Sequence, residues 1–276
     1  MSAFSFNTVE PHSLLAPYVA KMYVFESNGR LPIQERKLIV PNGNFKLTLT
    51  CRNGIAAHIS DRTFLQNENE ISLTGLIDTP VFLNPTEDVQ TGTIIIEFNP
   101  LGAYRLFRLP YSEVNNRIIS LEDMIGKGAA ALQSQLVDAD NLALKLQILE
   151  SFLIKQLDKA SPDPIFDYCV NSISYSQGLV SVVDLEKKTG YSSRYLHKKF
   201  TENLGTGPKN FAEIVRFRQF YQAYSTGADP HKLKSLIYQS YYDQSHFLRA
   251  FKRFTGSTPT DLQNSINELA NRHYRS

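Results

Sequence analysis

From Lys37 to about residue 98, apolar and polar positions alternate with the period of two that is typical of β-strands. Residues 45–50 show it most clearly, because every second side chain is apolar and would lie on one face of the strand. Asn53-Gly54 follows shortly afterwards and is a dipeptide typical of a tight hairpin turn. Similar patterns predict further strands at 20–26, 38–40, 55–60, 70–76, 80–83 and 92–98. Roughly six to eight strands in so short a segment indicate a small barrel or sandwich.

After Asn99-Pro100 the apolar residues recur every three or four positions, which is the period of a helix. This pattern predicts helices at 101–109, 121–125, 128–137 and 141–157. The last of them has the leucine spacing of a coiled-coil seam, formed by Leu142, Leu146, Leu149 and Leu153. Ile148 and Phe152 widen this stripe, which favours packing against the domain's own strands. A dimer seam and internal packing both stay open.

Two stretches near the C-terminus, 190–208 and 241–259, are versions of each other at an offset of 51 residues. One similar pair at such a spacing indicates a duplicated unit, since a solenoid needs three or more repeats. Each stretch has two apolar residues four positions apart, which share a helix face that must be buried. These pairs are Leu196 with Phe200 and Phe247 with Phe251.

Each repeated stretch predicts a helix with a marked start. Ser192 and Asp243 are suitable N-caps, because their side-chain oxygens can accept the free amide hydrogens of a first turn. A short apolar helix is predicted before each, at 180–189 and 233–239. A helix, a tight turn and a second helix with a basic outer face form the helix-turn-helix pattern, whose second helix enters the major groove of DNA. Two helical hairpins with solvated polar faces would show the same spacing.

The outer faces of the two predicted recognition helices carry the candidate DNA contacts. Arginine and lysine can donate to guanine O6 and N7, and glutamine can pair with adenine. Basic residues on the flanks suit phosphates, which fix register without reading sequence; these are Lys199, Lys209, Lys252 and Arg253. The predicted DNA-binding residues are Ser193, Arg194, His197, Lys198, Gln244, Ser245, Arg249 and Lys252.

The second stretch also resembles a known family. Tyr241–Phe247 with Arg249, followed by Gly256 and Thr258-Pro259, is similar to the signature of the AraC/XylS transcriptional regulators. The first stretch is similar to the first half of the same module.

This resemblance covers residues 173–265 and implies two helix-turn-helix units joined by a long helix at about 208–224. It implies further that Arg216, in this joining helix, ties the two halves together by ionic contacts. Ser240 departs from the family, which has glycine at the second turn.

The end of the strand-rich segment carries another resemblance. Phe98–Ala103, followed by Leu106-Phe107, is similar to a motif in the sensor-like N-terminal domains of some AraC-type regulators. It implies a cupin-like β-fold followed by helices. A metal-binding cupin needs a close histidine pair, a carboxylate and a further histidine, whereas His12 and His58 occupy unrelated positions. The sequence therefore predicts no metal.

Glu97 is the one acidic residue in its predicted strand. If it faced the interior, its carboxylate could bind a cationic effector. Simple alternation with Ile96 and Phe98 favours a solvent-facing side chain instead. No spacing typical of a catalytic residue, a cofactor or a phosphate-binding loop is found in the sequence, so neither an enzyme nor a cofactor is predicted.

Charge separates the two halves of the chain. Residues 1–165 carry 14 Lys/Arg and 18 Asp/Glu, whereas residues 166–276 carry 15 and 9, so the basic half is the half with the repeated helices. Cys51 and Cys169 are far apart and predict free thiols in a reducing cytoplasm. The sequence has no apolar run of 18 residues and no visible secretory signal, so no membrane contact is expected.

These observations predict a two-domain α+β protein. Residues 1–160 would form a β-rich, cupin-like barrel or sandwich with following helices, for ligand sensing or dimerisation. Residues 165–276 would form an all-α double helix-turn-helix domain. The linker before it is predicted at 160–164, because Pro162 and Pro164 stop a helix there. We expect a cytoplasmic, bacterial-type transcription regulator that binds double-stranded DNA. A small-molecule effector and RNA polymerase are further candidate partners, and monomer and homodimer both stay open.

Two other hypotheses remain at this point. One is a ligand-independent regulator whose N-terminal domain only oligomerises. The other is a small-molecule enzyme on the cupin-like barrel, with a passive helical appendage. The sequence does not distinguish activator from repressor and identifies neither the effector nor the operator.

Overall fold

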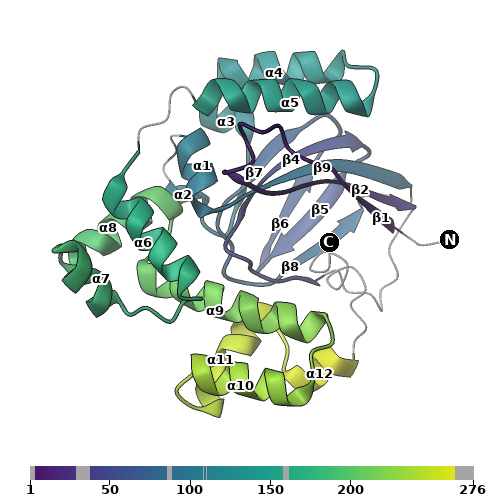
Figure 1. Ribbon diagram of the computed structural model, residues 1–276. Helices are drawn as coiled ribbons and strands as arrows, with labels where there is room; N and C mark the ends of the chain where they lie inside the picture. The colour runs from purple at the N-terminus through teal and green to yellow at the C-terminus, as the bar shows by residue number, and fades with distance from the viewer. Residues whose placement is uncertain are drawn as a thin grey trace.

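The computed structural model describes residues 4–28, 38–85, 89–107, 109, 111–157 and 162–264. An antiparallel β-structure occupies the N-terminal half, and helices form the C-terminal half (Figure 1). The predicted α+β fold class is therefore confirmed. The division at residues 160 and 165 stays a prediction, because one hydrophobic core runs without a break from the strands into the C-terminal helices.

The described strands of the N-terminal half form two antiparallel sheets. The larger has the strand order β1-β2-β9-β4-β7-β10, formed by Phe4–Thr8, Val19–Asn28, Gln90–Phe98, Phe45–Arg52, Ile71–Thr74 and Ile118–Ser120. The smaller has the order β3-β8-β5-β6, formed by Leu38–Ile39, Val81–Pro85, Ile55–Ile59 and Arg62–Gln66. The two sheets are separate, so the fold is a sandwich and not a closed barrel.

The larger sheet is buried on both faces. Ile94 and Ile96 of β9 point to one side, where they join the main core beneath the helices. Tyr23 and Phe25 of β2 point to the other side and pack with Ile55 of the smaller sheet. Side chains alternate across a strand, so this sheet has no solvent-facing row in its centre.

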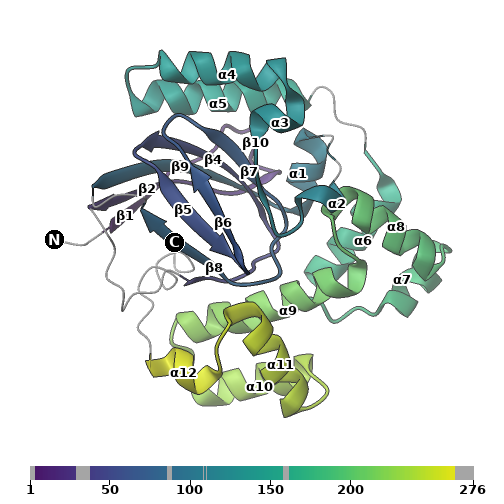
Figure 2. The ribbon, with the colours of Figure 1, turned by 180° about the vertical axis from the view of Figure 1, so that it is seen from behind.

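Among the N-terminal residues that the structure describes, five helices follow or interrupt the strands. They are α1 (Pro100–Leu106), α2 (Tyr111–Val114), α3 (Leu121–Ile125), α4 (Lys127–Val137) and α5 (Leu142–Leu157). Figure 2 shows α4 and α5 lying together over one side of the sandwich. Leu149 and Leu153 of the predicted seam are buried within the chain, whereas Leu142 is 40% exposed. The stripe thus packs inward at its C-terminal end, and the dimer seam stays a prediction.

The described part of the C-terminal half, residues 162–264, forms seven helices. They are α6 (Pro164–Tyr175), α7 (Val182–Thr189), α8 (Ser193–Leu204), α9 (Pro208–Ser225), α10 (Pro230–Ser240), α11 (Gln244–Thr255) and α12 (Pro259–Asn264). Both predicted caps are confirmed: Ser192 accepts from the Tyr195 amide and Asp243 from the His246 amide. Within the part of the chain that the structure describes, no helix is long and apolar enough to cross a membrane.

The two halves meet closely at the end of α8. Gly205 has a φ of +78°, which favours glycine, and a Cβ built there would lie 2.2 Å from the backbone oxygen of Tyr111 in α2. Phe166 of α6 packs edge-on against the rings of Tyr104 and Phe200. The C-terminal helices are therefore packed onto the sandwich domain by its helices α1 and α2.

Candidate nucleic-acid interface and inter-sheet cavity

Two helix-turn-helix pairs, α7 with α8 and α10 with α11, lie at opposite ends of α9 (Figures 1 and 2). Each second helix buries one apolar face against the core. On α8 this face is Leu196, Phe200 and Leu204, and on α11 it is Phe247, Phe251 and Phe254. Both helices begin at a side-chain cap and end at a left-handed glycine, Gly205 and Gly256.

The structure leaves the eight predicted DNA-binding residues exposed on two helices. Four lie on α8 and four on α11, on the faces that do not pack into the core. The first set is Ser193, Arg194, His197 and Lys198, and the second is Gln244, Ser245, Arg249 and Lys252. Lys198 makes an exposed ion pair with Glu202 at 3.7 Å, which contributes little and can be exchanged for a phosphate. Contact of these residues with DNA stays a prediction.

His197 has neighbours that restrict it. A Cβ built on Gly207 would lie 2.8 Å from its imidazole Nε2, so the ring is close to the turn between α8 and α9. The Thr201 hydroxyl donates to the His197 carbonyl at 2.9 Å. The His197 ring thus lies against the turn between α8 and α9, although helix periodicity placed it on the outer face of α8.

Two of the four flanking cations are held within the chain. Lys199 Nζ pairs with an Asp163 carboxylate oxygen at 2.7 Å, and Arg253 pairs with Asp78 and Glu213. Burial raises the pKa of Asp163, but the hydrogen bonds from Lys199 and from the Phe166 and Ile165 amides, together with the Lys199 charge, outweigh it, so the pKa is lowered. Lys209 and Lys252 are exposed on their helices. Only these last two have the setting expected of a phosphate contact.

Arg216 ties the two helix-turn-helix units together, but not by the ionic contact that the resemblance implied. Its guanidinium Nη1 donates to the backbone oxygen of Ser240 at 3.1 Å, which joins the middle of α9 to the end of α10. Ser240 is the last residue of α10 and is not among the described residues with a positive φ, and Tyr241 after it has a φ of −130° in the extended region. Because no left-handed conformation is needed at this turn, serine fits where the family has glycine.

Glu97 is buried, so the expectation of a solvent-facing side chain is wrong. The prediction failed because alternation exposes a residue only when one face of its sheet is exposed, and this sheet is buried on both faces. The carboxylate accepts hydrogen bonds from the Asn42 and Asn44 amides at 3.0 and 3.2 Å and from the Tyr23 hydroxyl at 3.3 Å. Its side chain is 3% exposed. Glu97 is therefore a structural carboxylate with several donors.

Two lysines flank Glu97 across the larger sheet. The register places Lys21 of β2 on one side of it and Lys46 of β4 on the other. Burial and the nearby Lys46 lower the pKa of Lys21, while Glu97 opposes the shift. The Lys46 ammonium lies 3.9 Å from Glu97, which is long for an ion pair. This row of one carboxylate and two ammonium groups has one positive charge in excess.

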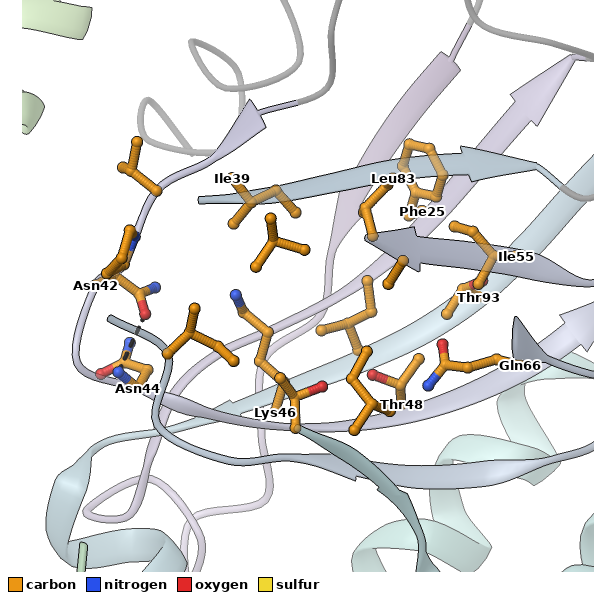
Figure 3. Close-up of a pocket in the computed structure, with 18 of the residues that line it drawn as sticks. Phe25, Ile39, Asn42, Asn44, Lys46, Thr48, Ile55, Gln66, Leu83 and Thr93 are labelled. Carbon is orange, nitrogen blue, oxygen red and sulfur yellow. Dashed lines mark hydrogen bonds between the residues drawn. The ribbon is translucent and has the colours of Figure 1, made fainter. Parts of the chain in front are cut away.

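A cavity lies between the two sheets, beside this row (Figure 3). Its lining is mostly apolar and comes from both sheets, with Phe25, Ile39, Ile55 and Leu83 among the residues. Lys46 reaches from β4 into the space between the sheets, near Asn42 and Asn44 (Figure 3). Thr93 lines the cavity too, and its hydroxyl is buried without a hydrogen-bond partner. The cavity could therefore hold an apolar molecule with a polar or anionic end.

The sequence pattern pointed to Glu97 but missed its partners Asn42, Asn44 and Lys46. Asn42 and Asn44 stand between the predicted strands 38–40 and 45–50, and nothing local shows that their amides turn inward. Within the described ranges, no group of three His, Cys, Asp or Glu side chains is placed to hold a metal ion. Cys51 and Cys169 are free thiols.

Two family models match the chain. One, described as "Helix-turn-helix domain", matches residues 185–265, and the other, "Domain of unknown function (DUF6597)", matches residues 7–120. No curated protein matches it.

Among solved structures, ToxT from Vibrio cholerae is similar at 15% identity, with 96% of this chain and 99% of that chain covered and a TM-score of 0.48. A structure of unsaturated fatty acid bound ToxT from Vibrio cholerae has 12% identity, 95% and 99% coverage and a TM-score of 0.49. The cupin domain of Schizosaccharomyces pombe Cnp3 has 11% identity, covers 38% of this chain and 68% of that chain, and has a TM-score of 0.29.

The match over residues 185–265 falls on the second half of α7 and on α8 to α12, which carry the capped, duplicated helix pairs described above. With its signature at 241–259, and with helix-turn-helix units at both ends of one joining helix, the C-terminal region of the chain is a helix-turn-helix domain of the AraC type.

Proposed function

We propose that this protein regulates transcription by binding double-stranded DNA through α8 and α11. The observation that carries the proposal is the pair of capped helices with exposed donors at the two ends of α9. This helix has 18 residues and is thus about 27 Å long at 1.5 Å per residue. Successive major grooves on one face of B-DNA are about 34 Å apart, so α9 and its flanking turns suit two adjacent grooves.

The hydrogen bonds of Glu97 also agree with a binding role and not with an enzymatic one. A general base needs a carboxylate that is free to take a proton from a substrate. Three hydrogen bonds from Tyr23, Asn42 and Asn44 already occupy the Glu97 oxygens. In a bacterium the proposed activity places the protein in the cytoplasm with the chromosome, where RNA polymerase is a candidate partner.

Salt dependence tests the electrostatic part of this proposal. Lys252→Ala is expected to weaken binding to all duplex sequences alike and to reduce the slope of log K against log salt by about one unit. Lys127→Ala, which removes an exposed lysine of α4, is the matched control and should leave the slope unchanged. Fluorescence anisotropy with a labelled duplex between about 50 and 200 mM salt measures both. Binding that does not depend on salt would contradict the proposal.

We infer that the cavity between the sheets takes a small effector with an apolar body and an anionic head. The apolar lining suits the body, and the loosely paired Lys46 ammonium suits the head. A buried apolar site with a few placed polar groups is the usual form of a small-molecule site.

Decanoate and decanol distinguish this ligand class from a purely apolar one, because they differ only at the head. Decanoate is expected to bind the wild type at least about tenfold more tightly than it binds Lys46→Met, since about 1.4 kcal/mol corresponds to tenfold. Decanol should bind both proteins equally. Titration calorimetry measures this, and equal decanoate affinities for the two proteins would contradict the assignment of Lys46.

A further inference from the structure

One polar network joins the sandwich to the second recognition helix. Asp78, in the loop between β7 and β8, accepts a hydrogen bond from Arg253 of α11 at 2.5 Å. The same carboxylate accepts from the Asn210 amide of α9 at 2.8 Å and from the Asn116 amide at 2.6 Å. Asp78 is 9% exposed, whereas the Arg253 side chain is 39% exposed, so the carboxylate is shielded from water more than the guanidinium is. It links residues that are 175 positions apart.

Arg253 is placed where a phosphate contact would be expected. It stands one helical turn after Arg249 and next to the exposed Lys252, close to the outer face of α11. Its guanidinium is instead shared between Asp78 and Glu213, the latter at 3.2 Å, and also contacts the Asn210 carbonyl oxygen at 2.7 Å. In this arrangement its donors face carboxylates and an amide oxygen of its own chain.

We propose that Asp78 is an autoinhibitory contact, which withholds Arg253 from DNA and restrains α11 against the sandwich. The inference rests on the proposed DNA-binding function. Without Asp78, Arg253 keeps the ion pair with Glu213 and the hydrogen bond to the side-chain oxygen of Asn210. The ion pair is partly exposed and so weak enough for a phosphate to compete with it. The sandwich then controls whether Arg253 is one of the cationic side chains that the DNA-binding half offers to DNA phosphates.

The position of Asp78 explains how the cavity can act on this contact. It directly follows Ile77 in the chain, and Ile77 and Val81 both line the cavity. The cavity lining contacts the joining helix at Asn42 too, because Arg218 of α9 donates to the backbone oxygen of Asn42 at 3.1 Å. Of these two contacts, that of Arg218 is made to Asn42, which lines the cavity, and that of Arg253 is made to Asp78, which is next to the lining residue Ile77. A ligand that moves this rim changes the contact of Asp78 with Arg253.

Salt-dependent DNA binding by the full chain tests the inference. Asp78→Asn removes the charge and keeps the shape of the side chain. Arg253 is then expected to contact a DNA phosphate, and this additional contact should steepen the slope of log K against log salt by about 0.9. Asp61→Asn, an exposed carboxylate on the same domain, is the matched control for the change in net charge. Arg253→Gln in the wild-type background should leave the slope nearly unchanged, because this arginine is already withheld.

The double variant Asp78→Asn with Arg253→Gln decides between release of Arg253 and a general loss of negative charge. Its slope is expected to return to that of the wild type. If Asp78→Asn gives the slope of Asp61→Asn, or steepens it equally without Arg253, the inference is overturned while DNA binding stands. If neither wild type nor Asp78→Asn binds duplex DNA, the proposed function fails and the inference fails with it. Near-ultraviolet circular dichroism of each variant shows that it is folded.

Discussion

Arg249→Ala is expected to relax the base preference in one half of the DNA site, and Arg194→Ala in the other half. Each arginine is exposed on the outer face of its own recognition helix. An arginine that donates to guanine O6 and N7 discriminates against a wrong base by about 1–3 kcal/mol. Because the two helices lie at opposite ends of α9, the two variants should affect different base pairs. Competition binding with single-base variants of the preferred duplex measures both effects.

Arg62→Ala is the control for these two variants, since it removes an exposed arginine from β6 of the sandwich. It should change neither half of the site. If Arg194→Ala and Arg249→Ala relaxed preference at the same base pairs, the two helices could not occupy separate grooves. A uniform loss over all sequences would instead identify both arginines as phosphate contacts.

Glu97→Ala is expected to lower the free energy of unfolding by about 2–5 kcal/mol, because it leaves buried donors unpaired. The Asn42 and Asn44 amides and the Tyr23 hydroxyl all donate to this carboxylate. The change also removes the negative charge that separates Lys21 from Lys46 in the sheet. Urea unfolding followed by circular dichroism measures the loss.

Glu122→Ala, which removes an exposed carboxylate of α3, should cost well under 1 kcal/mol in the same experiment. Glu97→Gln keeps the shape and should fall between the two. An effect of Glu97→Ala no larger than that of Glu122→Ala would show that the Glu97 network does not stabilise the sandwich.

The C-terminal helices could be predicted from the sequence because their signals are local. Ser192 and Asp243 cap helices within three residues of themselves, and the apolar pairs four apart mark the buried faces. Strand β6 has a mostly exposed, weakly apolar pattern and was not predicted. Helix α6 was not predicted either, although Asp163 caps it and Pro164 begins it.

The candidate site was predictable only in part. The eight exposed residues of α8 and α11 follow from helix period, which depends on neighbours along the chain. The side chain of Glu97 depends on what covers its sheet, and the pairing of Arg253 with Asp78 depends on packing between the halves. Neither the burial of Glu97 nor the pairing of Arg253 with Asp78 can be recognised in the local pattern of apolar and polar residues.

Selection of preferred sites from random duplex DNA tests the central claim most directly. Two different helix faces, joined in one chain, should select an asymmetric site of roughly 15–20 base pairs, with two conserved segments about one helical turn apart. Arg194→Ala should weaken the selection in one segment and Arg249→Ala in the other. A short palindrome occupied by two chains, or no enrichment of any sequence, would contradict the account.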